Sequence, residues 1–183
     1  MSVFTNPSGS AREAADAYIA ALLDFLGDRD PLRVQHELLA EVERSIAGLG
    51  DEDLRRPEAP GKWSILQVLE HLADQELVSA YRLRAITAEH EPPLPGYDQD
   101  AWARGLRYGT TGPAEVLALL RALRRRNLAL YDSLGPAEFE RVGIHAERGR
   151  ESAHRLCRLM GAHDLVHRRQ IARIRAAIGR PVA

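Results

Sequence analysis

The fold of this chain is decided by residues 151–178, which read ESAHRLCRLMGAHDLVHRRQIARIRAAI. On a helical wheel of roughly 100° per residue, apolar side chains recur on one face of this stretch and arginines recur on the other. His163 and His167 lie four residues apart on the apolar face. The stretch therefore predicts a long helix that points two imidazoles, about one turn apart, into the interior. That face holds Leu156, Leu159, Met160, His163, His167, Gln170 and Ile174.

The same spacing of apolar residues recurs in four earlier segments, each of which predicts a helix. Ser64 and Gln67 form a capping-box pattern at the start of one of them. Together with the last helix they predict an all-α protein, in which a short N-terminal helix within residues 1–30 precedes a four-helix bundle at residues 31–178. We expect a single domain across the 183 residues. The earlier helices are expected at residues 10–26, 31–49, 64–89 and 112–134.

A long connection at residues 91–111 joins the second and third helices of the predicted bundle. It carries several prolines and glycines together with Trp102, and a connection of this length is more often a binding loop or lid than a spacer. Trp102 could equally anchor the loop to the bundle. A second polar loop is expected around residues 140–149. No segment shows the alternation of apolar and polar residues that would predict a β-strand.

Composition and charge narrow the function classes. Charged residues make up 28% of the chain and the formal net charge is -1, whereas a general nucleic-acid binder carries a clear basic excess. We interpret the arginine clusters as solvated helix faces and expect no nucleic-acid partner. The clusters are Arg121, Arg124, Arg125 and Arg126, and Arg168 with Arg169.

Cysteine content and hydropathy indicate the compartment. Cys157 is the only cysteine, so no internal disulfide can form and a reducing compartment is expected. Residues 1–10 are polar and show no signal-peptide pattern, and no apolar run approaches the roughly 20 residues that cross a bilayer. We therefore expect a cytoplasmic protein that does not bind membranes.

Three histidines on two predicted helices form a candidate metal site. His71 lies on the helix at residues 64–89, while His163 and His167 lie on the last helix. Two imidazoles from one helix and one from a neighbour could hold a divalent ion and leave a coordination position open, as in catalytic sites. Buried imidazoles need partners, because an unpaired buried polar group costs about 1–3 kcal/mol. Alternatively, each histidine hydrogen-bonds to a buried carboxylate or carbonyl, and the histidine pattern alone leaves both interpretations open.

Short motifs along the chain resemble the DinB-like superfamily, also termed DinB/YfiT-like. The motifs are GKWSI at residues 61–65, HLAD at residues 71–74 and HDLVHRRQI at residues 163–171. Their order, with the Trp-bearing loop before the last motif, is similar to that of this family of four-helix-bundle metalloproteins. The resemblance covers about residues 31–178. It implies that His71, His163 and His167 hold the metal, with water in the remaining position.

The resemblance also implies an activity. Family members include bacillithiol S-transferases, mycothiol-dependent maleylpyruvate isomerases and domains of ergothioneine-forming enzymes. In the mechanism that these enzymes share, a metal ion lowers the pKa of a bound thiol or water and so supplies a nucleophile. We therefore expect a metal-dependent enzyme, in first place a thiol S-transferase that joins a low-molecular-weight thiol to an electrophile. The alternatives are a metal-dependent hydrolase, a thiol-dependent isomerase, or a non-catalytic metal-binding or dimeric interaction bundle.

The donor atoms and the family resemblance also indicate which metal ion and which oligomeric state to expect. Three histidine nitrogens suit zinc or nickel first, and they also accept iron, cobalt or manganese. Because members of the family are often dimers, the resemblance implies a homodimer.

Candidates for supporting the ligands or binding the substrate lie near the three histidines. Asp74 and Gln75 follow His71 by about one turn, although either could be an ordinary polar helix residue. Gln170 shares the face of the histidine pair and is the stronger candidate. Trp102 is a further candidate because its loop could cover the site.

Other reactive side chains are expected outside the site. Asp164 lies off the histidine face and is expected to be solvated. Cys157 lies roughly 100° from that face, so we expect a small core residue rather than a ligand or nucleophile. His145 falls in a predicted loop and is not assigned to the site. The remaining histidines lack paired spacing, and they are His36, His90 and His154.

Overall fold

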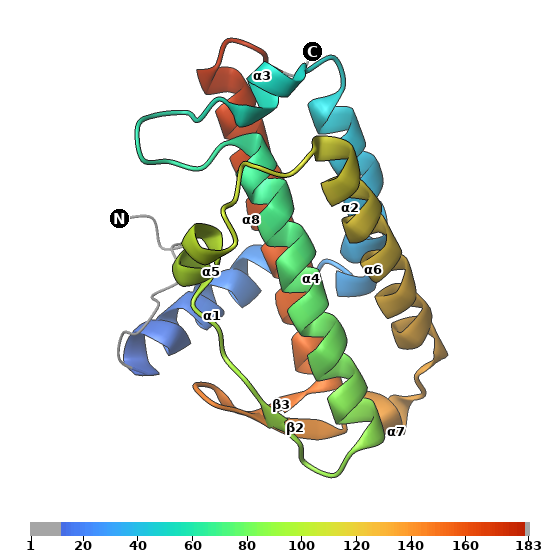
Figure 1. The fold of residues 1–183 in the computed structure, drawn as a ribbon. Coiled ribbons are helices and arrows are strands. Elements are labelled where there is room, and N and C mark those ends of the chain that lie inside the picture. Colours follow the sequence, from blue (N-terminus) through green and yellow to red (C-terminus); the bar gives the residue numbers. More distant parts are fainter. Residues whose placement is uncertain (1–11, 182–183) are drawn as a thin grey trace.

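Four long helices lie side by side in the computed structural model, which describes residues 12–181 (Figure 1). They are α2 (Pro31–Ile46), α4 (Ile65–Ala88), α6 (Pro113–Ser133) and α8 (Ala153–Ala177). Helices α4 and α8 run through the middle of the view, with α2 packed on α8 and α6 packed on α4. The predicted all-α class and four-helix bundle are confirmed, and each long helix begins and ends within a few residues of its predicted bounds.

Helix α8 is enclosed on several sides. It contacts α2 and α4 within the bundle, and α1 (Arg12–Leu26) crosses it from outside (Figure 1). Four consecutive residues in its middle, Gly161 to Asp164, are all buried. Gly161 permits the close approach of α2, because a Cβ atom there would lie 3.1 Å from the Cα atom of Pro31. At this level of the helix a polar side chain is therefore buried on whichever side it points.

The start of α4 follows the capping box expected from the sequence. Ser64 Oγ accepts a hydrogen bond from the backbone N–H of Gln67 at 3.3 Å, and Gln67 Oε1 accepts one from the N–H of Ser64 at 2.9 Å. This reciprocal pairing satisfies two backbone donors at the helix terminus. It fixes the start of the helix that presents His71 about two turns further on.

Shorter helices join or cover the long ones. Helix α1 buries an apolar side against α2 and α8, and its predicted start at Ser10 lies outside the described residues. The predicted loop between the second and third bundle helices contains α5 (Gln99–Gly105), on which Trp102 packs against Tyr97 with ring centroids 4.7 Å apart. The remaining short helices are α3 (Asp51–Arg55) and α7 (Pro136–Phe139). No helix in the described part of the chain is long and apolar enough to cross a membrane.

A small β-sheet closes one end of the bundle (Figure 1). Strand β2 (Val142–His145) pairs in parallel with β1 (Pro93–Leu94) and antiparallel with β3 (Gly149–Ser152). The expectation that the chain forms no strands is therefore wrong. Each strand has four residues or fewer, which is too short for the alternation that identifies a strand in sequence. The sheet ties both connecting loops together at the end of the bundle where α8 begins.

Candidate metal centre

Three imidazole nitrogens converge between α4 and α8. The Nε2 atom of His163 lies 3.0 Å from Nε2 of His71 and 3.1 Å from Nε2 of His167. All three side chains are buried. Two nitrogens bound to one zinc ion at about 2.0–2.1 Å, with angles between about 90° and 109°, lie about 2.8–3.4 Å apart. The three histidines could therefore hold one ion.

The helices explain this convergence. His163 and His167 stack one turn apart on α8, and α4 packs alongside and brings His71 from the other side. The structure thus brings together the three histidines that the sequence singles out. That they bind a metal stays a prediction, which the chemistry of the donor set can test.

The tautomer of one histidine is fixed by Gln170. The Nδ1 atom of His167 lies 2.7 Å from the amide oxygen of Gln170, which can only accept a hydrogen bond. Nδ1 therefore carries the proton and the Nε2 lone pair points toward the other histidines. Gln170 thus contacts and orients the imidazole of His167, and its role beside a bound metal stays a prediction. The Nδ1 atoms of His71 and His163 have no hydrogen-bond partner among the described residues.

The electrostatics of the cluster favour neutral imidazoles. Burial, reinforced by the neighbouring histidines, holds the pKa of His71 and of His163 well below its ordinary value. Burial lowers the pKa of His167 to about 4. At neutral pH these side chains are uncharged and keep lone pairs available for a cation.

The three Nε2 atoms cannot all be satisfied by hydrogen bonds to one another. His163 Nε2 has two imidazole neighbours, but a neutral ring carries at most one proton at that atom. Because the Nε2 atom of His167 carries no proton, only one of the two contacts can be a hydrogen bond. A metal ion between the three lone pairs would satisfy all of them at once. The residues present therefore fit a divalent cation.

The remaining candidates near the histidines differ in their contacts. Gln75 accepts a hydrogen bond from the hydroxyl of Tyr97 at 2.7 Å and lines a cavity that reaches the histidines. Asp74 accepts a hydrogen bond from the hydroxyl of Tyr108, at the end of the connection between α4 and α6. Trp102 packs on Tyr97 and so anchors α5. Asp74 and Trp102 thus hold the connection that covers this part of the bundle.

The expectation that Asp164 is solvated is wrong. Its carboxylate is fully buried and accepts two hydrogen bonds from the guanidinium of Arg124, at 2.6 and 3.0 Å. Arg124 also pairs with Glu76 at 2.8 Å, so the view of this arginine as part of a solvated face is wrong as well. Burial raises the pKa of Asp164 to about 6, although Arg124 opposes the shift. The helical wheel misplaced Asp164 because α8 is covered on more than one side, and Arg124 is buried because α6 packs against α4 and α2.

Cys157 is buried in the core, as expected. Its Sγ atom lies 3.3 Å from the amide nitrogen of Gln35, which belongs to α2. Burial raises the pKa of the thiol to about 12. A thiol held neutral in this way is a poor nucleophile and a poor metal ligand.

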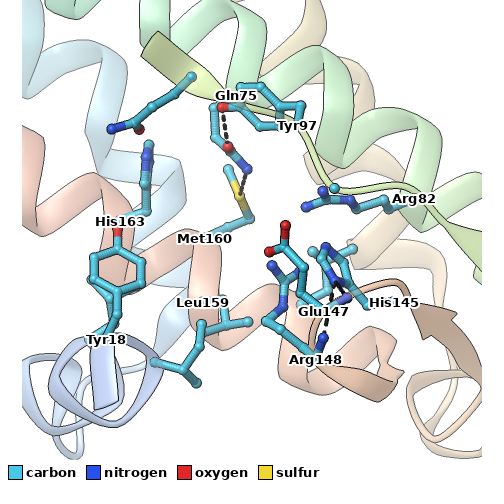
Figure 2. A pocket seen from close by; sticks show the side chains of 15 residues that line it. Tyr18, Gln75, Arg82, Tyr97, His145, Glu147, Arg148, Leu159, Met160 and His163 are labelled. Atoms are coloured by element: carbon cyan, nitrogen blue, oxygen red, sulfur yellow. Dashed lines mark hydrogen bonds between the residues drawn. The ribbon is translucent and has the colours of Figure 1, made fainter. Parts of the chain in front are cut away.

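A cavity begins at His163 and runs between α4 and α8 toward the sheet (Figure 2). It encloses about 740 Å³ of empty space, its open mouth included. Apolar side chains of α8 line one wall, namely Leu156, Leu159 and Met160. The far end is polar and includes Arg82 and His145. His145 therefore does reach the cavity, contrary to expectation, because the segment predicted as a loop is strand β2.

The amino-acid sequence is similar to that of a known protein family and of several named bacterial proteins. The sequence model of the DinB superfamily matches residues 35–171. A Bacillus subtilis relative named "Putative metal-dependent hydrolase YfiT" is 31% identical over 63% of this chain, and the match spans 65% of that protein. A Bacillus licheniformis protein, also named "Putative metal-dependent hydrolase", is 32% identical over 79% of each chain.

A solved structure shares the fold. It is YfiT from Bacillus subtilis, described as a probable metal-dependent hydrolase with an unusual four-helix bundle topology. It superposes with a TM-score of 0.75 at 27% sequence identity, over 81% of this chain and 86% of the other.

Proposed function

Because this chain belongs to the DinB superfamily, we propose that it is a metal-dependent enzyme whose ion is held by His71, His163 and His167. The observation that supports this most directly is the convergence of three neutral imidazoles at the end of an accessible cavity. A divalent ion bound there would lower the pKa of a thiol or water and supply a nucleophile at neutral pH. Three neutral ligands leave the positive charge of such an ion undiminished, which suits that role.

The reaction that we propose is transfer of a small thiol to an electrophile. The carbon–sulfur bond forms as the bond to the leaving group breaks, the leaving group departs with the electron pair, and the thiol proton passes to solvent. Among the described residues that line the cavity, the only carboxylate is that of Glu147, which lies beside Gly96 and His145 at the far end. Hydrolysis draws on a positioned base to move protons, whereas attack by a thiolate does not. The lining therefore favours a sulfur nucleophile.

Neutral side chains next to His163 shape the reaction space. Burial raises the pKa of the Tyr97 hydroxyl, which stays protonated and donates to Gln75. The amide group of Gln75 in turn donates to Ser79 at 3.2 Å. Gln75 and Ser79 also donate hydrogen bonds to Sδ of Met160, at 3.5 and 2.8 Å, so this chain of hydrogen bonds adjoins the apolar face of α8. Gln75, Tyr97 and Met160 thus line the path along which an extended substrate would reach His163.

Hydrolysis is the second candidate, and the names carried by the relatives favour it. The same centre could activate water in place of a thiol. The two candidates differ in the product, a thioether in one case and a free acid or alcohol in the other. They can be compared on a single preparation of the protein.

A paired assay tests the proposal. Zinc-loaded and nickel-loaded protein would be given cysteine with an activated aryl chloride, and separately a p-nitrophenyl ester without thiol. We expect thioether formation above the uncatalysed rate, absent in His163→Ala. Faster ester hydrolysis with no thioether would favour the second candidate. Neither product above the level of the His163→Ala variant, with metal bound, would contradict an enzyme of either kind.

A further inference from the structure

The end of the cavity away from the metal centre contains two buried nitrogen donors. Arg82 comes from α4 and is 3% exposed, and His145 comes from β2 and is 2% exposed. Both line the cavity that reaches His163, and Figure 2 shows them on the side opposite that histidine. Neither is used by the proposed reaction, so their presence in the cavity needs a separate explanation.

Each of the two side chains has an N–H group with no acceptor. His145 Nδ1 accepts hydrogen bonds from the backbone N–H groups of Glu147 and Arg148, at 3.1 and 3.3 Å, so the ring proton lies on Nε2. Nε2 of His145 and Nε of Arg82 are both buried and have no partner among the described residues. Buried donors without an acceptor are rare in native proteins. Two of them in one cavity indicate an acceptor that arrives with a ligand.

One cation at this end of the cavity, Arg82, forms no ion pair with a carboxylate of the described residues. Arg148 forms two hydrogen bonds with the buried carboxylate of Glu151, at 2.6 and 2.8 Å, and these charges cancel. Arg82 donates to the backbone oxygen of Pro95 at 2.6 Å, and no carboxylate of the described residues pairs with it. Burial lowers its pKa to about 10, so it is still protonated at neutral pH. The exposed residue Glu147 lines the same end of the cavity, and its carboxylate acts on Arg82 through space without forming an ion pair with it.

We propose that this end of the cavity binds a carboxylate group of the substrate. A planar guanidinium and a neutral imidazole N–H suit the planar, acceptor-only carboxylate. Arg82 offers one positive charge outside any ion pair, which suits a single negative charge better than a phosphate dianion, and the Glu147 carboxylate at the same end further disfavours a dianion. On α4, His71 and Arg82 are eleven residues apart, about 16 Å along the helix. The reacting atom and the carboxylate of the substrate therefore lie at opposite ends of the cavity. The role of the reacting atom rests on the proposed function, but the carboxylate site does not.

Matched pairs of probes test the site directly. Isothermal titration of the wild-type protein with octanoate and with 1-octanol compares ligands that differ only in the charged group. We expect octanoate to bind at least about tenfold more tightly, since hydrogen bonds to a charged group have this effect. Equal affinity for the two probes would overturn the proposal without reference to any variant. Tighter binding of octyl phosphate than of octanoate would assign the site to a phosphoryl group instead and also overturn it.

Variants locate the site within the cavity. Arg82→Gln and His145→Phe should each abolish most of the preference for octanoate, while Arg125→Gln, at an exposed position of α6, should retain it. A preference that survives in both cavity variants would place the binding elsewhere and overturn the proposal. On zinc-loaded protein, 12-mercaptododecanoate should gain affinity over dodecanoate, whereas 3-mercaptopropionate is too short to reach both ends.

The two proposals can fail separately. Octanoate binding needs no metal, so it should persist in metal-free protein and in His163→Ala. An Arg82-dependent octanoate site in a protein that takes up no metal would support this inference and contradict the proposed function. A protein that binds one ion but does not distinguish octanoate from 1-octanol would support the proposed metal centre and contradict the carboxylate site.

Discussion

The Nε2 atom of His71 lies 3.0 Å from the Nε2 atom of His163, although 92 residues separate the two in sequence. This contact joins α4 to α8 at the inner end of the cavity. In water-free surroundings two neutral imidazoles gain little from such a contact unless a proton or a cation lies between them. The position of this pair is therefore the feature from which the proposed metal centre follows.

Gln170 is predicted to set the metal affinity through His167. Replacing it by methionine in Gln170→Met removes the oxygen that accepts the Nδ1 proton at 2.7 Å. We expect zinc affinity to fall about 10- to 100-fold, as for other partners of ligating histidines. Competition with a chromophoric chelator measures this. Gln170→Glu keeps an acceptor and should bind zinc at least as tightly as the wild type. Unchanged affinity in Gln170→Met would refute this role.

Arg124 is predicted to be essential for the stability of the bundle. In Arg124→Met the buried carboxylates of Asp164 and Glu76 would lose the cation that both contact. Removal of one member of a buried ion-pair group costs about 3–5 kcal/mol of unfolding free energy. Urea denaturation measures the change. The neighbouring Arg125 is exposed, so Arg125→Met should change stability by less than about 0.5 kcal/mol. Similar stability of the two variants would contradict a stabilising role for the ion pairs of Arg124 with Asp164 and Glu76.

His145 is predicted to make stability depend on pH. Burial, helped by Arg148 and Arg82, lowers its pKa to about 4, whereas in the unfolded chain it lies near about 6.5. As pH falls below about 6.5, the unfolded state takes up a proton that the folded state does not, so folding becomes less favourable. The contribution of His145 is thus complete above pH 6.5 or so and is lost progressively toward pH 4.

The variant His145→Gln tests this dependence. Urea denaturation at intervals between pH 7 and pH 4 should show a smaller loss of unfolding free energy in the variant than in the wild type. His154→Gln, which replaces an exposed histidine on α8, serves as the control and should follow the wild type. A His145→Gln variant with the same pH slope as the wild type would show that His145 titrates alike in both states.

The long helices and the three histidines could be predicted because they follow a single periodicity. Apolar residues every three or four positions identify a helix, and the same pattern places His163 and His167 on its inner side. No periodicity links residues on different helices, so His71 could be proposed as a third ligand on a neighbouring predicted helix, and the motifs shared with the DinB-like superfamily strengthened that choice. Gln170 was identified for the same reason as the histidine pair, because it shares their face of α8.

The parts that sequence reasoning missed depend on contacts between distant segments. Strand β2 is four residues long and is recognisable only by its pairing with β1 and β3. The pairing register of β2 places the His145 side chain in the cavity lining, and a loop prediction does not determine the direction of a side chain. Asp164 and Arg124 look solvated on their own helices. Asp164 is buried because α1, α2 and α4 pack around α8, and Arg124 is buried because α2 and α4 pack against α6. A helical wheel describes one helix and contains no information about what covers its other side.

Metal content tests the central claim most directly. Untagged protein would be purified without added metal, incubated with zinc or nickel, desalted and analysed by elemental mass spectrometry beside His71→Ala, His163→Ala, His167→Ala and the surface control His154→Ala. The account predicts about one ion per chain in the wild type and in the control, and loss of that ion in the three other variants. A wild-type protein that retains neither zinc nor nickel, or an ion that survives all three replacements, would contradict it.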